Sequence, residues 1–388
     1  MIADRVKNTP PSGIREFFDL VLGMPEVISL GVGEPDFITP WRIREKAITA
    51  LEEGYTSYTS NKGLRVLREG ISRRIKKRYD ISYDPDEEVL ITVGVSEGLD
   101  LALRAVLNPG DAVVVVSPHY VAYPALVAMN HGKVLPLITT EQEQFKINPD
   151  RLERLLKKNP KAIILNYPSN PTGATYRRDE LRTLWKYLRR KDTVVITDEA
   201  YEDISFDVAH TPFAVLDSRA RDRTIHLSGF SKGCAMTGFR VGYACASQKF
   251  IGAMTKIHSF SMLCGPIVSQ LAGIEALRTE KEIAQMTKAY RRRREFMVKE
   301  LNRIGLPAHM PQGTFYCFPS VSATGLTAME FAKRLLFEEK VAVVPGTAFG
   351  QEFGEYVRMS CANTLDSLKE AAIRIERFVG RVCCEGKR

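Results

Sequence analysis

The chain has 388 residues, of which 44% are hydrophobic and 26% charged, a balance that excludes a disordered protein and predicts one large and one smaller globular domain. Its net charge of +9 is densest in residues 291–294, but this run lies in a helical pattern from about 281 to 303 and predicts a solvated helix face. No nucleic-acid-binding module, signal peptide or membrane-spanning apolar run is recognisable, so neither nucleic acid nor a membrane is an expected partner.

The first part of the chain is predicted to begin irregularly and then to become helical. Ser12 could cap a short helix, and residues 28–37 are predicted to form a short strand that runs into a turn of Gly and Pro. Helices are expected at about 39–53 and 64–79, on either side of a polar loop that carries two tyrosines.

From residue 89 onward, strands and helices alternate. Apolar strand-like runs occupy residues 89–93, 112–116, 161–166, 193–198, 224–228 and 241–246, with helices expected at about 94–107 and 179–190. This pattern is typical of a mostly parallel sheet covered on both faces, whose ligands lie at the carboxyl ends of the strands. The chain is then helical to about residue 303 and ends in a smaller α+β unit with strands at 313–318, 341–344 and 356–360.

The seven cysteines form no C-x-x-C pair, and several lie in apolar strand-like runs. An odd number in such positions favours reduced, mostly buried thiols over a disulfide framework or a zinc site. We therefore expect a cytoplasmic protein.

Residues 228–243 contain the strongest candidate for a reactive group. Lys232 lies between two strand-like runs, among Gly and Ser residues that let the backbone turn sharply. A desolvated lysine in such a place can lose its proton and attack a carbonyl group, and Arg240 offers a planar fork for a phosphate or carboxylate. The alternative on this stretch alone is a surface loop with two ordinary cations.

Other polar side chains also follow predicted strands. Asp198 ends an apolar strand, where an isolated carboxylate is costly unless it is paired, and it could hold a proton on a heterocyclic nitrogen. Residues 166–173 carry two asparagines in Pro-containing turns, Tyr120 offers a ring for stacking, and residues 94–98 begin a helix whose free N–H groups favour a phosphate. Each feature has an ordinary structural explanation, but their convergence at one sheet edge favours a ligand site.

Five motifs together resemble one family of enzymes. In chain order they are Gly33-Glu-Pro-Asp-Phe37, Asn166-x-Pro-x-Asn170-Pro-Thr-Gly173, Asp198-Glu-x-Tyr201, Ser231-Lys232 and Gly238-Phe-Arg240-x-Gly242. Over nearly its whole length the chain resembles the class I/II aminotransferases of pyridoxal-phosphate fold type I, in the aspartate and aromatic branch. The resemblance implies an α/β fold, with a mostly parallel seven-stranded sheet between helices and a smaller α+β domain from the two chain ends. The implied segments are 1–45, which joins the small domain, 46–290, the large cofactor-binding domain, and 291–388, the C-terminal small domain.

The resemblance also implies roles around the ring of the cofactor, pyridoxal 5'-phosphate. Lys232 would bond to the cofactor and later move a proton between the substrate's Cα and the cofactor. Asp198 would pair with the protonated ring nitrogen, which keeps the ring an electron sink. Tyr201 and Asn170 would hydrogen-bond the phenolic oxygen, and Tyr120 occupies the place of the stacking aromatic residue.

The cofactor's phosphate would be held by Arg240, by the turn Val95-Ser96 and by a hydroxyl group near the lysine. Some relatives have Ser where this chain has Gly229, so the hydroxyl belongs to Ser228 or Ser231, and the sequence leaves that choice open.

Substrate and subunit contacts are implied in the same way. Arg358 would clamp the substrate's α-carboxylate, assisted by the backbone of Gly33 and the side chain of Asn170, with Tyr120 beside the substrate. Tyr58 matches a tyrosine that reaches the phosphate of the neighbouring subunit, which implies a homodimer with shared active sites.

The implied reaction is a ping-pong transamination between an L-amino acid and a 2-oxo acid, most often 2-oxoglutarate. Aspartate and aromatic amino acids are the favoured donors, while alanine, 2-aminoadipate and a diaminopimelate-type donor stay open, because residues around 12–15 and loops read the side chain. The alternative enzyme is a C–S β-lyase or an aminocyclopropane-carboxylate synthase on the same fold. A transcription regulator is disfavoured because the motif at residue 33 leaves no room for a preceding helix-turn-helix. An inactive binding protein is disfavoured because Lys232, Asp198 and Arg358 are intact.

Overall fold

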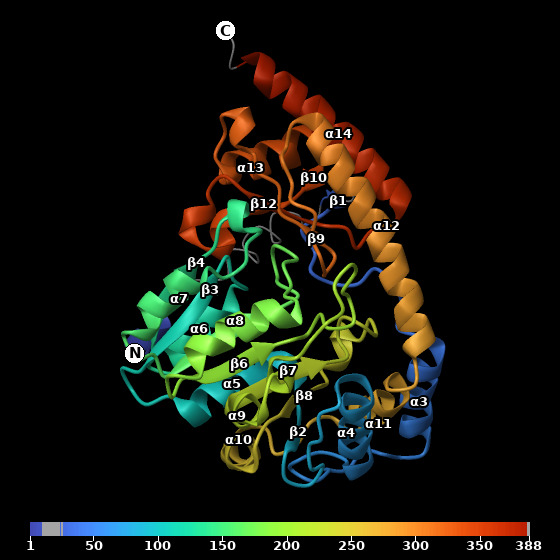
Figure 1. The fold of residues 1–388 in the computed structure, drawn as a ribbon. Helices are drawn as coiled ribbons and strands as arrows, with labels where there is room; N and C mark the ends of the chain where they lie inside the picture. Colours follow the sequence, from blue (N-terminus) through green and yellow to red (C-terminus); the bar gives the residue numbers. More distant parts are fainter. Residues whose placement is uncertain (10–23, 25, 386–388) are drawn as a thin grey trace.

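The computed structural model describes residues 1–9, 24 and 26–385 (Figure 1). The helix predicted at Ser12 and the substrate-reading residues 12–15 lie outside this described part. At the centre is a seven-stranded sheet in the order β2 (Val89–Thr92), β8 (Gly242–Cys245), β7 (Thr224–Gly229), β6 (Val194–Asp198), β5 (Ala162–Asn166), β3 (Ala112–Ser117) and β4 (Lys133–Ile138). Because β8 is antiparallel to both neighbours and the other pairs are parallel, the predicted mostly parallel seven-stranded sheet is confirmed.

The sequence predicts six of these strands individually and misses β4. This strand lies at the edge of the sheet, contains Pro136 and exposes or half-exposes most of its side chains. Proline cannot donate to a strand ladder and is tolerated at such edges, so β4 lacks the continuous apolar run that marks the inner strands.

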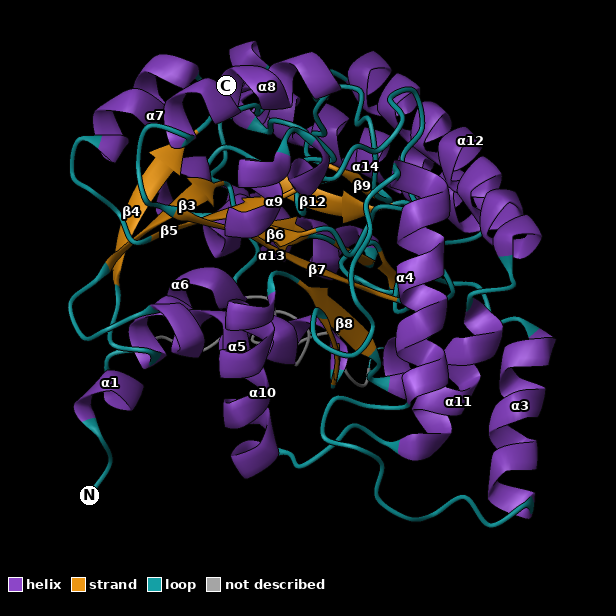
Figure 2. Ribbon diagram, turned by 60° about the horizontal axis from the view of Figure 1, so that its bottom comes forward, coloured by secondary structure: helices purple, strands orange, loops and turns teal. Residues whose placement is uncertain are grey.

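Helices cover both faces of the sheet (Figure 2). One face carries α5 (Gly94–Val106), α6 (Ala122–Met129) and α10 (Gln248–Ser261), and the other carries α7 (Pro149–Leu156) and α8 (Arg178–Leu188). The alternation of strand side chains explains both layers, because Val113 and Val115 enter the first core and Val114 enters the second.

A third core lies against the β2–β8 end of the sheet. It is built by α3 (Trp41–Glu52), α4 (Arg65–Tyr79) and α11 (Ile267–Ala276), together with the start of α12 (Glu280–Ile304). The remaining short helical segments are α1 (Asp4–Lys7), α9 (Ser218–Arg223), η1 (Glu141–Glu143), η2 (Phe213–Val215), η3 (Thr237–Phe239), η4 (Ser322–Thr324), η5 (Gly346–Phe349) and η6 (Gln351–Phe353).

The two ends of the chain meet in a separate core. Here β1 (Ile28–Ser29) pairs with β10 (Val341–Ala342), and β11 (Val344–Pro345), β12 (Val357–Ser360) and β9 (Tyr316–Cys317) form a three-stranded sheet. The helices α13 (Ala328–Glu339) and α14 (Leu365–Glu385) and the second half of α12 complete it. Figure 1 shows α12 running as one long helix beside both parts of the molecule. The strands predicted at 313–318 and 341–344 are shorter than expected, the second being divided into β10 and β11.

The prediction for residues 291–294 is wrong in part. Arg292 is exposed, but Arg294 is 2% exposed, lies 4.5 Å from the ring centroid of Phe206 and pairs with Asp207 at 2.8 Å. An arginine can be buried in this way because its apolar stem and flat guanidinium pack while its N–H groups stay paired. In the described part of the chain, each helix is too short or too polar to span a bilayer.

Candidate active site

Three neighbouring strands bring the predicted site residues together at the carboxyl edge of the sheet. In the ladder, Asn166 on β5 is opposite Asp198 on β6, and Asp198 is opposite Leu227 on β7. The loops that follow these strands carry Asn170, Tyr201 and Lys232. The register of the sheet therefore places the two polar strand ends beside the lysine loop.

The amine of Lys232 faces the N-terminal segment of the chain. Its Nζ donates a hydrogen bond to Gly33 O at 2.6 Å and lies 5.7 Å from the ring centroid of Tyr201. Burial lowers the pKa of Lys232 to about 8, an effect opposed by Glu34 and reinforced by the positive charge of Arg358. An amine with this pKa is partly neutral near physiological pH and can act as a nucleophile or a base.

Asp198 is a buried carboxylate with two hydrogen-bond donors. Tyr123 on α6 donates its hydroxyl proton to Oδ2 at 2.6 Å, and the backbone N–H of Ala200 donates to Oδ1 at 3.2 Å. Burial raises the pKa of Asp198 above its usual range, although these donors act against the rise. Tyr123 was not predicted as a site residue. Its signal is the spacing Tyr120-x-x-Tyr123 at the start of a helix, and that helix was itself missed.

Arg358 and Asn170 join the sheet to the core of the chain ends. The guanidinium of Arg358, 2% exposed, donates from Nη1 to Asn170 Oδ1 at 3.0 Å and from Nη2 to Gly31 O at 2.6 Å. Among the described residues its Nε has no hydrogen-bond partner. A buried guanidinium held by two uncharged oxygens retains a full positive charge for a carboxylate ligand.

Aromatic residues cover this guanidinium. The ring centroids of Tyr316 and Phe349 lie 4.4 and 5.0 Å from its central carbon. The hydroxyl group of Tyr316 is also 2.9 Å from that of Tyr201. A Cβ at Gly33 would approach Tyr316 Oη to 2.8 Å, so a side chain at position 33 would displace this arrangement. Tyr316 is a second residue that the sequence analysis missed.

An anion-site geometry lies where β2 ends and β8 begins. Their antiparallel register pairs Thr92 with Gly242, and a Cβ on Gly94 would come within 2.6 Å of an Arg240 guanidinium nitrogen. Gly94 has a φ of +75° and begins α5, so the free N–H groups of Val95 and Ser96 open toward the same place as Arg240. This geometry suits a phosphate.

The two candidate serines differ in their surroundings. Ser228 is fully buried on β7 and donates its hydroxyl to Glu202 Oε1 at 3.1 Å, whereas Ser231 is half-buried in the lysine loop. The Ser228 hydroxyl is therefore directed into a buried network beneath the site. Tyr120 is half-buried edge-on to Tyr123, with centroids 5.7 Å apart, and Tyr58 is 82% exposed.

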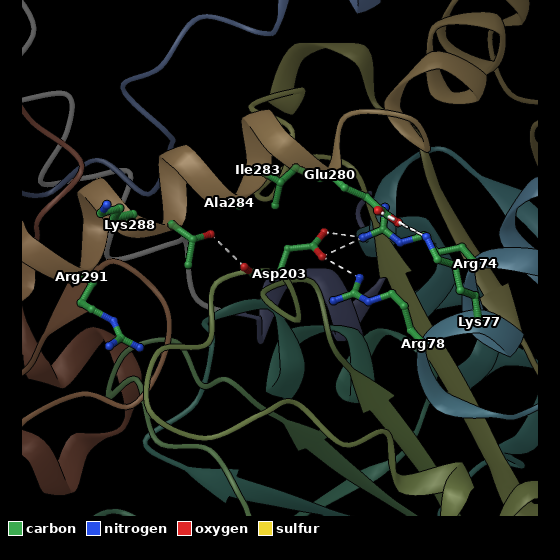
Figure 3. Close-up of a pocket in the computed structure, with 10 residues that line it drawn as sticks. Arg74, Lys77, Arg78, Asp203, Glu280, Ile283, Ala284, Lys288 and Arg291 are labelled. Atoms are coloured by element: carbon green, nitrogen blue, oxygen red, sulfur yellow. Dashed lines mark hydrogen bonds and ion pairs between the residues drawn. The ribbon is translucent and has the colours of Figure 1, made fainter.

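A buried ion cluster lies beside the lysine loop, and Figure 3 shows its members Asp203, Arg74 and Arg78. The Asp203 carboxylate accepts from Arg74 at 2.7 Å and from Arg78 at 2.7 Å, and these arginines lower its pKa to about 2 although burial alone would raise it. A Cβ on Gly233, the residue after Lys232, would lie 2.5 Å from Asp203 Oδ2. The cluster lines a hollow of about 760 Å³ beside α12. Asp203 thus packs directly against the residue after Lys232, and no motif in the sequence marks this cluster.

The side chains present fit the cofactor that the resemblance implies. Such a cofactor needs an amine that can lose its proton, a buried carboxylate for a ring nitrogen and an anion cradle for a phosphate. Lys232 supplies the first, Asp198 the second, and Arg240 with the start of α5 the third. Gly94 suits this cradle, because its φ of +75° favours glycine and a Cβ there would lie 2.6 Å from an Arg240 guanidinium nitrogen.

Comparison with known proteins agrees with this geometry. Residues 25–375 match the family described as aminotransferase class I and II. The chain is 41% identical to the aspartate aminotransferase of Pyrococcus abyssi over 97% of this chain and 98% of that protein. It is 38% identical to the aromatic-amino-acid aminotransferase 2 of Thermococcus litoralis, again over 97% and 98%. The structure of the Thermus thermophilus aspartate aminotransferase with maleate superimposes with a TM-score of 0.92 at 35% identity, over 97% of this chain and 99% of that one.

Proposed function

Since the chain belongs to the class I and II aminotransferases, which use pyridoxal phosphate, we propose that it moves the amino group of aspartate or an aromatic L-amino acid to a 2-oxo acid such as 2-oxoglutarate. Relatives named for both substrate classes resemble the chain to a similar degree. The proposal depends on one observation: the site holds both a lysine amine of lowered pKa and the buried guanidinium of Arg358, which has no carboxylate partner within the described residues.

We assign the cofactor contacts as follows. When bound, pyridoxal phosphate supplies an aldehyde that bonds to amines and a ring that accepts electron density from the substrate's α-carbon. Asp198 holds the ring nitrogen in its protonated form, and Tyr201 and Asn170 orient the phenolic oxygen. Tyr120 would lie beside the ring, and Lys232 would hold the aldehyde and serve as the base for the α-proton.

The phosphate belongs to the cradle at the start of α5. Arg240 contributes the charge, the backbone of Val95 and Ser96 contributes N–H donors, and Ser231 contributes the hydroxyl. We choose Ser231 over Ser228 because the Ser228 hydroxyl already bonds Glu202.

The substrate is held at its head group by Arg358 and by the neighbouring backbone of Gly33. An amino acid bound through its α-carboxylate at Arg358 has its amino group directed toward Lys232, which also bonds the 31–33 segment. The rings of Tyr316 and Phe349 beside this place favour an aromatic substrate side chain. We propose aspartate as a substrate because of the likeness to relatives that are named for it.

We also propose that the enzyme is a homodimer in which Tyr58 reaches the partner's phosphate. Tyr58 is 82% exposed, and a hydrogen bond from Asn61 Nδ2 to Leu263 O at 2.8 Å joins its loop to the segment after α10, the helix that carries Phe260, which is 90% exposed. Large exposed rings of this kind mark surfaces that a partner covers. The segments 1–45, 46–290 and 291–388 remain our proposed domain division, and the free cysteines support a cytoplasmic location.

Mixing two inactive variants tests the shared site. If Tyr58 serves the partner, random assembly of Lys232→Ala with Tyr58→Ala subunits restores about one quarter of the sites, because each mixed dimer has one site with both residues intact. If Tyr58 serves its own subunit, mixing restores no activity, and the shared-site proposal is wrong.

The function itself is tested by absorbance of the purified holoenzyme, titrated with aspartate, phenylalanine, glutamate and cysteine separately. Conversion of the visible cofactor band by aspartate or phenylalanine, with release of the matching 2-oxo acid and recovery by 2-oxoglutarate, is the expected result. Lys232→Ala is the control and should not turn over. Release of pyruvate and ammonia without amino-group exchange would instead identify a lyase.

A further inference from the structure

Tyr316 touches three parts of the site, and its hydroxyl group has no role in the proposed function. It lies on β9 and is 1% exposed. Its hydroxyl group contacts Tyr201, its ring covers Arg358, and its Oη lies against the backbone of Gly33. β9 is held by β12, with Tyr316 opposite Ser360, so the small sheet that positions Arg358 also positions this ring.

The hydrogen bond between Tyr316 and Tyr201 determines which hydroxyl group donates its proton. The two oxygens are 2.9 Å apart, so one hydroxyl donates its proton and the other accepts it. A Tyr201 hydroxyl that donates to the cofactor's phenolic oxygen has used its one proton, and its oxygen must accept from Tyr316. Because burial raises the pKa of both phenols, each is protonated near neutral pH and able to donate.

We infer that Tyr316 is a positioning residue that donates its hydroxyl proton to Tyr201 and thereby directs the Tyr201 proton toward the phenolic oxygen of the cofactor. This inference rests on the proposed function. In a chain of hydrogen bonds each donor polarises the next, so Tyr316 strengthens the donation by Tyr201. Donation to that oxygen favours its anionic form and lowers the pH at which the bound cofactor loses its proton.

The hydroxyl and the ring of Tyr316 can be tested separately. Tyr316→Phe removes the donor but keeps the ring over Arg358, so it leaves substrate carboxylate binding intact. If Tyr316 acted mainly through Arg358, Tyr316→Phe would change nothing and Tyr316→Leu would raise KM for all amino acids.

The experiment is a pH titration of the visible cofactor band in four holoenzymes: the unchanged chain, Tyr316→Phe, Tyr201→Phe and the double variant. We expect Tyr316→Phe to raise the midpoint by roughly half to one pH unit, from the net strength of one hydrogen bond. In the Tyr201→Phe background the same substitution should cause no shift, because the donor acts through Tyr201. The kcat value should fall several-fold in Tyr316→Phe with KM unchanged.

Tyr290→Phe is the matched control. Tyr290 is also 1% exposed, and its ring packs on Phe315, which in turn packs on Tyr316. Loss of this buried hydroxyl should leave the midpoint in place. A second variant, 3-fluorotyrosine at position 316, keeps the shape and is a stronger donor, so it should lower the midpoint even if Tyr316→Phe folds poorly.

Two results would overturn the inference. One is an unmoved midpoint in Tyr316→Phe and in the fluorotyrosine protein, and the other is an equal shift in the Tyr201→Phe background. Both leave the aminotransferase intact. Absence of a visible band in the unchanged holoenzyme would instead overturn the proposed function and this inference together.

Discussion

The contact between Tyr123 and Asp198 allows a quantitative prediction. Tyr123→Phe removes one hydroxyl group and keeps the ring, which is 2% exposed and packs in the core beneath α6. The Tyr123 hydroxyl donates to Asp198 Oδ2 at 2.6 Å, and the backbone donor at Ala200 stays in place on Oδ1. The substitution therefore weakens the environment of the carboxylate without removing the carboxylate.

The size of the effect follows from the charge of the acceptor. A hydrogen bond to an ionised group contributes about 1.5–3 kcal/mol, which corresponds to a rise of roughly one to two units in the pKa of Asp198. Burial already raises that pKa, and the lost donor acted in the opposite direction, so the two effects add. Weaker stabilisation of the ionised carboxylate disfavours the charged ring nitrogen by the same free energy, so kcat should fall roughly 10- to 100-fold.

The assay is the rate of the half-reaction with one amino acid between pH 5 and 9. We expect the acid limb of the profile to move to higher pH by roughly one to two units, with little change in KM. Tyr176→Phe serves as the control, because Tyr176 is another buried phenol of the large core and its oxygen accepts from Ile147 N at 3.1 Å, away from the site. An acid limb that stays in place, with kcat within about twofold of the unchanged enzyme, would refute the reasoning.

Three further predictions concern the head-group site, the lysine and the buried network. Arg358→Lys should raise KM roughly 10- to 100-fold for aspartate and phenylalanine alike, since a lysine cannot form the two-pronged pair; a loss confined to one donor in steady-state kinetics would contradict this. The rate at which the apoprotein regains cofactor absorbance should rise with pH around a midpoint near 8, the pKa of Lys232; a midpoint above 10 would indicate a solvated amine. Glu199→Gln should lower the free energy of unfolding by about 3–5 kcal/mol at pH 7 in urea titrations, because Glu199 pairs with His210 at 2.5 Å and His226 at 3.1 Å. Burial would raise the pKa of Glu199, but the histidines hold that pKa below its usual range. The stabilisation is therefore complete above the pKa of the unfolded carboxyl group, about 4.5, and is lost as the pH falls further. A difference in unfolding free energy that persists unchanged at pH 3 would contradict the pairing.

The sequence predicted the parts of the site that depend on strand ends. Asp198 and Lys232 follow apolar runs, and a parallel sheet brings such ends to one edge whatever the details of packing. The sequence left the choice between Ser228 and Ser231 open, because that choice depends on where β7 ends and on the Glu202 contact. β7 extends to Gly229, so Ser228 alternates onto the same face as His226, toward the buried carboxylates, and this is why we propose Ser231 for the phosphate.

Tyr123 and Tyr316 could not be found in the same way. Tyr123 lies on a helix whose apolar pattern is short, and its distance to Asp198 is set by how α6 packs on the sheet, 75 residues away in sequence. Tyr316 lies on a two-residue strand, and its contact with Tyr201 spans 115 residues. Periodicity describes the face of one element and carries no information about such tertiary distances.

Different parts of the site face the head group and the side chain of the proposed substrate, and this explains why the sequence predicts the reaction class but not the preferred side chain. Lys232 Nζ and Arg358 Nη2 each bond a carbonyl of one short segment, Gly33 O and Gly31 O, both at 2.6 Å. Two residues span at most roughly 7 Å, so this backbone fixes the amine and the guanidinium within reach of an amino group and a carboxylate on the same carbon. The head group common to all α-amino acids would thus be bound by a motif with a strong sequence signature. The substrate side chain would instead meet rings from β9 and η5, which lie outside that motif, so the motif predicts the reaction class and not the preferred donor.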